Sequence, residues 1–112
     1  MNGTVLLITE NGMGKADQNL QLTLIHKYFD LLLQSPDLPS AICFYTNGVQ
    51  LVCEGSPVLE QLYALESKNV RLIICSTCLN YFELNEKVKV GIVGGMGDIL
   101  EAQIKADKVI TI

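Results

Sequence analysis

Two cysteines separated by two residues, Cys75 and Cys78, form the pattern with the clearest chemistry in this chain of 112 residues. The run Val70–Cys75 is typical of a buried strand and Leu79–Phe82 of a short helical turn, so both thiols are predicted where a strand ends and a helix begins. Ligands and chemistry gather at the carboxyl ends of strands in open α/β sheets. The chain has one histidine and no tryptophan, so we expect sulfur to be the agent of any chemistry.

The environment predicted for Cys75 favours a reactive sulfur. The last residue of a parallel strand points into the crevice at the carboxyl edge of the sheet. Ser76 or Thr77 is expected to cap the next helix, so that its free N–H groups face the sulfur. A helix N-terminus lowers the pKa of a nearby thiol and favours the nucleophilic thiolate. We therefore expect Cys75 to be partly exposed and to have a lowered pKa.

A Cys-x-x-Cys pair also fits other functions. Zinc would need two further ligands, and the candidates are Cys43, Cys53 and His26; Cys43 is expected mid-strand and His26 on a solvent-facing stripe, so we expect no metal and no cofactor. A thioredoxin-like redox pair is disfavoured because Ser76 and Thr77 between the thiols supply hydroxyls but no rigid proline. The remaining alternative is that the thiols are small buried residues without a role, which is also our interpretation of Cys43 and Cys53.

Two loops contribute to the candidate site. Gly12 and Gly14 follow a predicted strand, a position that binds anions in phosphate loops. Asp17 stands where the dinucleotide fingerprint has its third glycine, and its charge would repel phosphate, so we interpret the segment as a tight turn. A turn is also predicted at Asn47-Gly48. The candidate substrate contacts beside Cys75 and Cys78 are Gly12, Asn47, Ser76 and Thr77.

Strands and helices alternate along the chain. Helices are expected from Asp17 to about Gln34, from Ser56-Pro57 to Glu66, and from about Asp98 to Lys105. Short strands rich in Val and Ile that alternate with helices indicate a parallel sheet covered on both faces. We predict one α/β domain over residues 1–112, a flavodoxin-like three-layer sandwich with a five-stranded, mainly parallel sheet. The strands are expected at Thr4–Thr9, Ser40–Tyr45, Val70–Cys75, Val88–Val93 and Lys108–Ile112.

The first predicted helix has an unusually wide apolar face. At about 100° per residue, its apolar side chains spread over roughly 220°. A sheet covers only part of such an arc. The surplus indicates a subunit interface or a neighbouring helix. The residues are Leu20, Leu22, Leu24, Ile25, Tyr28, Phe29, Leu31, Leu32 and Leu33.

Composition excludes several partners. The formal charge is −4, from 8 basic and 12 acidic residues, so we expect no nucleic acid and no anionic membrane as a partner. No apolar run approaches the ~18 residues of a membrane span, and the first residues lack the pattern of a signal peptide. With four cysteines, we expect a cytoplasmic protein with free thiols.

The sequence resembles the DsrE/DsrF-like family over nearly its whole length, and within it the DsrE-like domain of YedF-type proteins. That domain is sulfurtransferase-like and linked by name to selenium metabolism. Two features depart from the pattern: Ser76 stands where those proteins have glycine, and the Cys-Pro motif of their sulfur-carrier domain does not occur. The chain is thus expected to be a stand-alone form or an excised domain. The matching segments are Phe44–Val49, Glu54–Ser56, Leu62–Val70, Cys75–Tyr81 and Ala106–Ile110.

The resemblance implies a function and an assembly. Sulfur-relay members carry a persulfide on a cysteine at the end of the third strand, which matches Cys75, and Cys78 is the additional thiol of the YedF-type pattern. It also implies a homo-oligomer (dimer, trimer or hexamer). We expect a sulfurtransferase-like protein that takes sulfane sulfur, or selenium, from a donor protein and passes it to an acceptor's thiol, with Cys78 as the resolving thiol. The alternative is a non-catalytic interaction or small-ligand-binding protein with incidental thiols.

Overall fold

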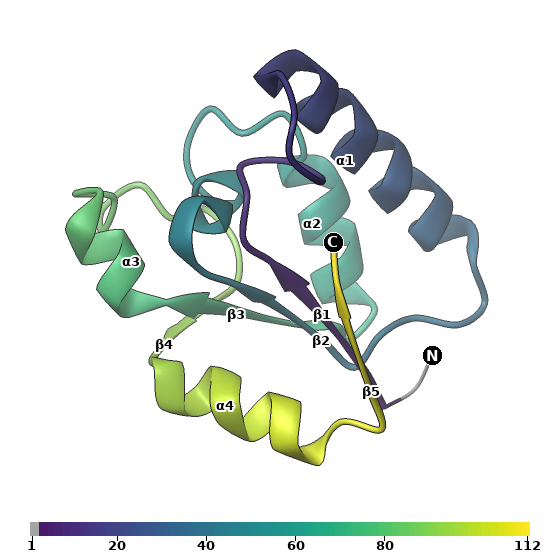
Figure 1. The fold of residues 1–112 in the computed structure, drawn as a ribbon. Helices are drawn as coiled ribbons and strands as arrows, with labels where there is room; N and C mark the ends of the chain where they lie inside the picture. The colour runs from purple at the N-terminus through teal and green to yellow at the C-terminus, as the bar shows by residue number, and fades with distance from the viewer. Residues whose placement is uncertain (1–2) are drawn as a thin grey trace.

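A computed structural model describes residues 3–112, which form a parallel sheet with helices on both faces (Figure 1). The strands are β1 (Thr4–Ile8), β2 (Ala41–Phe44), β3 (Arg71–Cys75), β4 (Ile92–Gly94) and β5 (Lys108–Thr111). The helices are α1 (Gln18–Gln34), the 3₁₀ helix η1 (Thr46–Val52), α2 (Leu59–Ser67), α3 (Ser76–Tyr81) and α4 (Met96–Lys105). No helix within the described range is long and apolar enough to cross a membrane.

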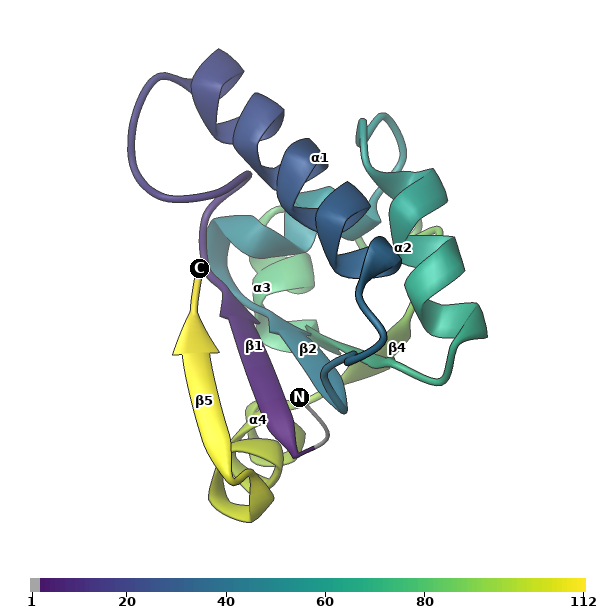
Figure 2. The same ribbon diagram turned by 90° about the vertical axis from the view of Figure 1, so that its right-hand side faces the viewer.

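The order of the strands explains the layers. All neighbours in the sheet β4-β3-β2-β1-β5 are parallel, which confirms the predicted layered α/β class. The order itself, which the sequence left open, differs from the 2-1-3-4-5 order of flavodoxin. The chain adds strands in one direction from β1 to β4 and then crosses the sheet to place β5 beside β1. Because crossovers are right-handed, the helix of this reversed connection covers the opposite face from the helices of the earlier connections. Accordingly, α1 and α2 cover one face and α4 the other (Figures 1 and 2).

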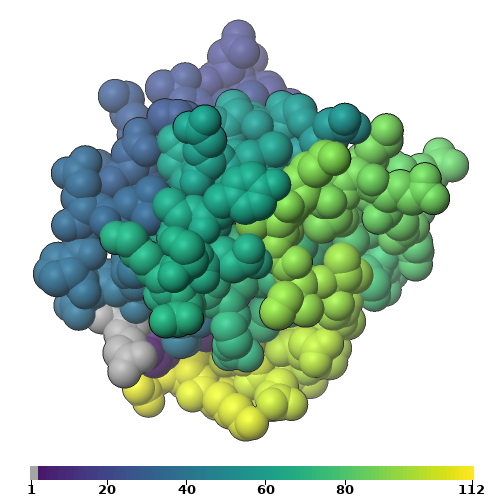
Figure 3. Space-filling model, turned by 180° about the vertical axis from the view of Figure 1, so that it is seen from behind, coloured from purple at the N-terminus to yellow at the C-terminus, as the bar shows by residue number. Residues whose placement is uncertain are grey.

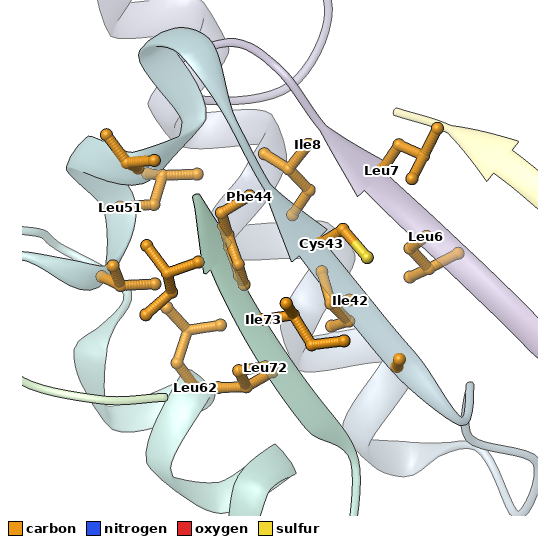
Figure 4. Packing of buried hydrophobic residues seen from close by; sticks show 14 of the residues in the cluster. Leu6, Leu7, Ile8, Ile42, Cys43, Phe44, Leu51, Leu62, Leu72 and Ile73 are labelled. Atoms are coloured by element: carbon orange, nitrogen blue, oxygen red, sulfur yellow. The ribbon is translucent and has the colours of Figure 1, made fainter. Parts of the chain in front are cut away.

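The core is thickest between the sheet and the α1–α2 layer. Alternate residues of the three central strands point to this face, and all of them are buried to 1% exposure or less. They pack against Ile25 and Phe29 of α1 and Leu62 and Leu65 of α2, which are fully buried. Figure 4 shows part of this packing. The strand residues on this face are Leu6, Ile8, Ile42, Phe44, Leu72 and Ile74.

The predicted start of the fourth strand at Val88 is wrong, because the segment before β4 pairs elsewhere. Val88 forms an isolated antiparallel bridge with Cys53, and the Lys89 N–H donates to the Val52 carbonyl (2.9 Å). The Tyr63 hydroxyl also donates to the Lys89 carbonyl (2.8 Å). The segment therefore lies beside α2 on the surface (Figure 3), and β4 is only three residues long.

Two helix starts also differ from the prediction. Ser56 does not cap α2: its hydroxyl accepts the N–H of Val58 (3.2 Å) in a local turn, and α2 begins at Leu59. The last helix begins at Met96 rather than near Asp98, because the Asp98 carboxylate turns back and accepts the Gly95 N–H (2.8 Å). In α2 a local turn therefore replaces the expected cap. In α4 the bond of Asp98 is itself a capping interaction, made from the third helical residue back to the N-cap.

The 3₁₀ helix η1 was not predicted. It begins after β2, where only a turn at Asn47-Gly48 was expected, and it buries Val49, Leu51 and Val52. Gly48 makes this possible, since a Cβ at this position would overlap the Ile8 carbonyl. The absence of a side chain lets η1 pack directly on the end of β1, and η1 thereby closes the carboxyl edge of the sheet.

Candidate functional site

The two thiols lie where a strand ends and a helix begins, as predicted. Cys75 is the last residue of β3 and the N-cap of α3, and Cys78 lies in the first turn of α3. Both cysteines are reduced. Cys75 is among the groups that raise the pKa of Cys78, so the two thiols lie close together. The structure therefore contains an adjacent dithiol at the carboxyl edge of the sheet.

The expected partial exposure of Cys75 is wrong. Cys75 is only 1% exposed, whereas Cys78 is half-buried. The reason is that β3 is an interior strand, paired with β2 on one side and with β4 on the other, where Gly94 lies opposite Cys75. The end of such a strand is covered by both neighbours and by the turn that follows.

The expected capping of α3 by Ser76 or Thr77 is also wrong. Cys75 occupies the N-cap position with an extended backbone, and its side chain makes no capping hydrogen bond among the described residues. Ser76 and Thr77 are the first two helical residues; Ser76 is half-buried and Thr77 is exposed. They remain beside the thiols, but in the helix rather than before it.

A third group contacts the pair. The backbone N–H of Thr46 donates a hydrogen bond to Cys78 Sγ over 3.1 Å. This bond lowers the pKa of Cys78, but burial and the nearby Cys75 side chain raise it more, so that the net shift is upward. The Thr46 N–H can therefore stabilise a Cys78 thiolate, although the rest of the site favours the neutral thiol.

Thr46 was missed by the sequence analysis. Its φ is +48°, in the left-handed region, which is unusual for a β-branched residue. Its hydroxyl is within 2.7 Å of the Thr9 carbonyl just after β1. The carboxyl ends of adjacent parallel strands meet at one edge of a sheet. The position of Thr46, two residues past β2, was therefore a signal in the sequence that it lies near the end of β3. Nothing in the sequence indicated the left-handed backbone.

The candidate substrate contacts Gly12 and Asn47 lie in different surroundings. Gly12 is buried under α1, where a Cβ would come within 2.5 Å of Gln21 Cβ, so the absence of a side chain lets the loop pack closely on the helix. Asn47 directly follows Thr46 and accepts a hydrogen bond from Gln50 Nε2 (3.3 Å). It lines a polar cavity of about 210 Å³ together with Glu10, Asn11, Gln18, Gln21 and Gln50.

The other candidate metal ligands do not join the dithiol. Cys43 is fully buried in β2 (Figure 4), and burial raises its pKa to about 11. Cys53 donates its thiol hydrogen to the Val49 carbonyl (3.2 Å), and His26 pairs with Asp30 through Nδ1 and Oδ2 (3.1 Å). Within residues 3–112 no three His, Cys, Asp or Glu side chains are grouped to hold a metal ion. The geometry gives the zinc alternative no support.

These features define a three-layer α/β domain with a reduced dithiol at the edge of its sheet. The model of the DsrE/DsrF-like family matches residues 4–112, and the chain belongs to this family, which is associated in general with sulfur relay. No curated protein matches the chain.

Solved structures share the fold. The protein of unknown function MTH1491 from Methanobacterium thermoautotrophicum is 21% identical, with 97% of each chain covered and a TM-score of 0.69. The ychN protein from E. coli is 17% identical, with 97% of this chain and 98% of the other covered and a TM-score of 0.70. BT1422 from Bacteroides thetaiotaomicron, also of unknown function, is 13% identical, with 98% and 95% covered and a TM-score of 0.69. At these identities the likeness concerns the fold alone.

Proposed function

We propose that this chain is a sulfur-relay protein that carries sulfane sulfur as a cysteine persulfide on the Cys75–Cys78 pair and passes it to a partner's thiol. The observation that carries the proposal is the pair of neighbouring thiols at the carboxyl edge of a DsrE/DsrF-like domain. Neighbouring thiols allow a sulfur atom to be exchanged or released within one site.

The chemistry needs no cofactor. A thiolate of the pair attacks the outer sulfur of a donor persulfide, the donor's S–S bond breaks, and the donor leaves as a thiolate. An acceptor thiolate then attacks the outer sulfur of the cysteine persulfide and releases the protein's thiolate. Alternatively, Cys78 attacks the inner sulfur of a persulfide on Cys75, which forms a disulfide and expels hydrosulfide. The same displacements serve selenium in place of sulfur, which is the link to selenium metabolism that we propose.

Mass spectrometry after incubation with a small persulfide donor tests this function. The reduced protein should gain one sulfur atom, and Cys43→Ala and Cys53→Ala should gain it as well, because these thiols lie outside the pair. A variant in which both Cys75 and Cys78 are replaced by alanine should gain none. Equal loading of that double variant and the wild type would refute the proposal.

The proposed partners are donor and acceptor proteins and further copies of this chain. A surface on α4, β4 and β5, hereafter the α4 surface, exposes large apolar side chains, which mark contact sites when they gather. We propose that this surface forms the homo-oligomer interface, whether dimer, trimer or hexamer. The cytoplasm is the proposed compartment, because thiols stay reduced there. The α4 surface comprises Ile92, Met96, Leu100, Ile104 and Val109.

The alternative is a small-ligand-binding protein with incidental thiols. A cavity of about 370 Å³, lined in part by Leu22, Phe82 and Leu84 with Asn11 and Gln50 at its polar side, favours it. Its volume is in the range of small-molecule sites. Failure of the loading experiment would leave this alternative as the stronger one.

A further inference from the structure

We infer that sulfur enters the dithiol at Cys78, with the Thr46 N–H positioning its sulfur atom, and passes from there to Cys75. The inference rests on the proposed sulfur-relay function and gives that function a direction. It differs from the assignment implied by the family resemblance, in which the cysteine at the end of the third strand meets the donor.

Accessibility separates the two thiols. An attacking thiolate must come within about 3–3.5 Å of the donor's sulfur, with the leaving sulfur in line behind it. Cys75 is 1% exposed, enclosed by the neighbouring strands. Cys78, half-buried on the first turn of α3, has a side open to solvent. A donor therefore reaches Cys78 without any rearrangement of the sheet, whereas it reaches Cys75 only if the structure opens.

The backbone N–H of Thr46 is held in an orientation that faces Cys78. The Thr46 hydroxyl lies 2.7 Å from the carbonyl oxygens of both Thr9 and Tyr45, and the hydrogen bond to Thr9 ties the residue to the end of β1. Two residues later, Gly48 allows η1 to rest on the carbonyl of Ile8. In this arrangement the left-handed backbone of Thr46 directs its N–H at Cys78 Sγ. A fixed donor of this kind favours a negative sulfur, either thiolate or persulfide.

The relay then takes two balanced steps. The Cys78 thiolate attacks the outer sulfur of a persulfide donor, and the donor departs as its thiolate. Cys75, at the N-cap of the helix whose first turn carries Cys78, loses its proton and attacks the outer sulfur of the Cys78 persulfide. The S–S bond breaks, and Cys78 takes up the proton that Cys75 released. The sulfur ends on the buried thiol, shielded from other thiols until an acceptor binds.

Sulfur loading of single variants tests the direction. With glutathione persulfide as the donor, Cys75→Ala should load one sulfur on Cys78 at a rate close to that of the wild type. Cys78→Ala should load Cys75 at least tenfold more slowly, because the donor must wait for an opening. Loading of Cys75 in Cys78→Ala at the wild-type rate would overturn the inference.

Alkylation separates this inference from the proposed function. If the wild type gains no sulfur, the proposed function fails, yet iodoacetamide still reports which thiol an electrophile meets first. Peptide mapping at short times should show Cys78 modified before Cys75. The reverse order would overturn the entry role of Cys78 whatever the outcome of sulfur loading.

The positioning role of Thr46 has its own readout. Thr46→Val removes the hydroxyl that ties the peptide down, so the pH midpoint of Cys78 alkylation should rise. Thr46→Ser keeps the hydroxyl and should keep the wild-type midpoint, and Thr23→Val, which removes an exposed hydroxyl of α1 bonded to the Asn19 carbonyl, should do the same. Thermal unfolding checks that all three variants are folded. A midpoint that Thr46→Val leaves unchanged, or that Thr46→Ser moves equally, contradicts the role.

Discussion

The thiols of this domain differ in surroundings more than their spacing suggests. The sequence pattern identified Cys75 and Cys78 and their position at a strand–helix junction, because a strand followed by a helix can be read from hydrophobicity alone. Which of the two faces solvent depends on the neighbours of β3, and these follow from strand order, which the sequence left open. Thr46 could not be identified for a similar reason: its role comes from a backbone conformation that threonine rarely adopts.

A disulfide between Cys75 and Cys78 is expected on mild oxidation. Residues three apart on a helical turn have Cβ atoms about 5–6 Å apart, so a small shift of the first turn of α3 brings them within bridging distance. The test uses the Cys43→Ala, Cys53→Ala background and counts free thiols by mass spectrometry after alkylation. Two free thiols after oxidation would remove the resolving role of Cys78.

Cys43 predicts a loss of stability at alkaline pH. Burial raises its pKa from 9.0 to about 11 in the folded protein, with Arg71 lowering it by a smaller amount. A group whose pKa is raised on folding stabilises the fold fully below the unfolded pKa and loses this contribution as pH rises through the folded pKa. The free energy of unfolding should therefore fall between about pH 9 and pH 11.

Cys43→Ala separates this thiol from other titrating groups. Chemical denaturation at intervals across that range should show a shallower decline for the variant than for the wild type. The variant will start from a lower stability, because alanine leaves a gap in the core. Parallel curves for the two proteins would mean that Cys43 does not contribute to the decline.

At the scale of elements, the alternating pattern predicted the central strands to within a residue or two and failed where polar side chains or glycines act locally. Val88 is apolar and β-branched, yet it pairs with Cys53 rather than extending β4. The bounds of α1 were read correctly from the stop at Ser35-Pro36 and from Asp17, which occupies the N-cap position but makes no side-chain capping hydrogen bond among the described residues. In contrast, η1 packs on β1, and a contact between segments far apart in the chain cannot be read from the local sequence.

Gly48→Ala should destabilise the fold. The added Cβ would overlap the carbonyl of Ile8, and η1 must move away from β1 to make room. Overpacking of this kind costs about 1–3 kcal/mol, measurable by urea denaturation. The matched control is Gly97→Ala in the first turn of α4, where a Cβ meets no atom within 4 Å among the described residues. This control should stabilise the protein by about 0.5–1 kcal/mol, and equal effects of both substitutions would contradict the close approach.

At the scale of the molecule, apolar side chains are exposed on two separate surfaces. In the wide apolar arc of α1, three residues are buried, three are half-buried and three are exposed, the exposed ones being Leu20, Leu24 and Leu31. The α4 surface carries more exposed apolar residues, including Ile104 at 73% exposure. The sequence directed attention to α1 because its apolar run is long, whereas the α4 surface is assembled from three elements.

Charge substitutions distinguish the two surfaces. Light scattering at micromolar concentration should show more than one subunit for the wild type. Leu100→Glu on the α4 surface should shift the protein to the monomer, because a charge buried in an apolar interface is costly. Leu31→Glu on α1 should leave the assembly intact. If Leu31→Glu alone dissociates it, the interface lies on α1 instead, and a monomeric wild type would contradict the proposal of a homo-oligomer.

The place of β5 in the sheet has a consequence for synthesis on the ribosome. This strand pairs with β1, although residues 4–7 and their partners 108–111 lie at opposite ends of the described chain. The strands β1, β2 and β3 emerge and can associate while one edge of β1 still has open N–H and C=O groups. Such an edge is a template for pairing with neighbouring nascent chains. Slow translation between β3 and β5 is therefore expected to lengthen the time for which this edge can pair with neighbouring chains on polysomes.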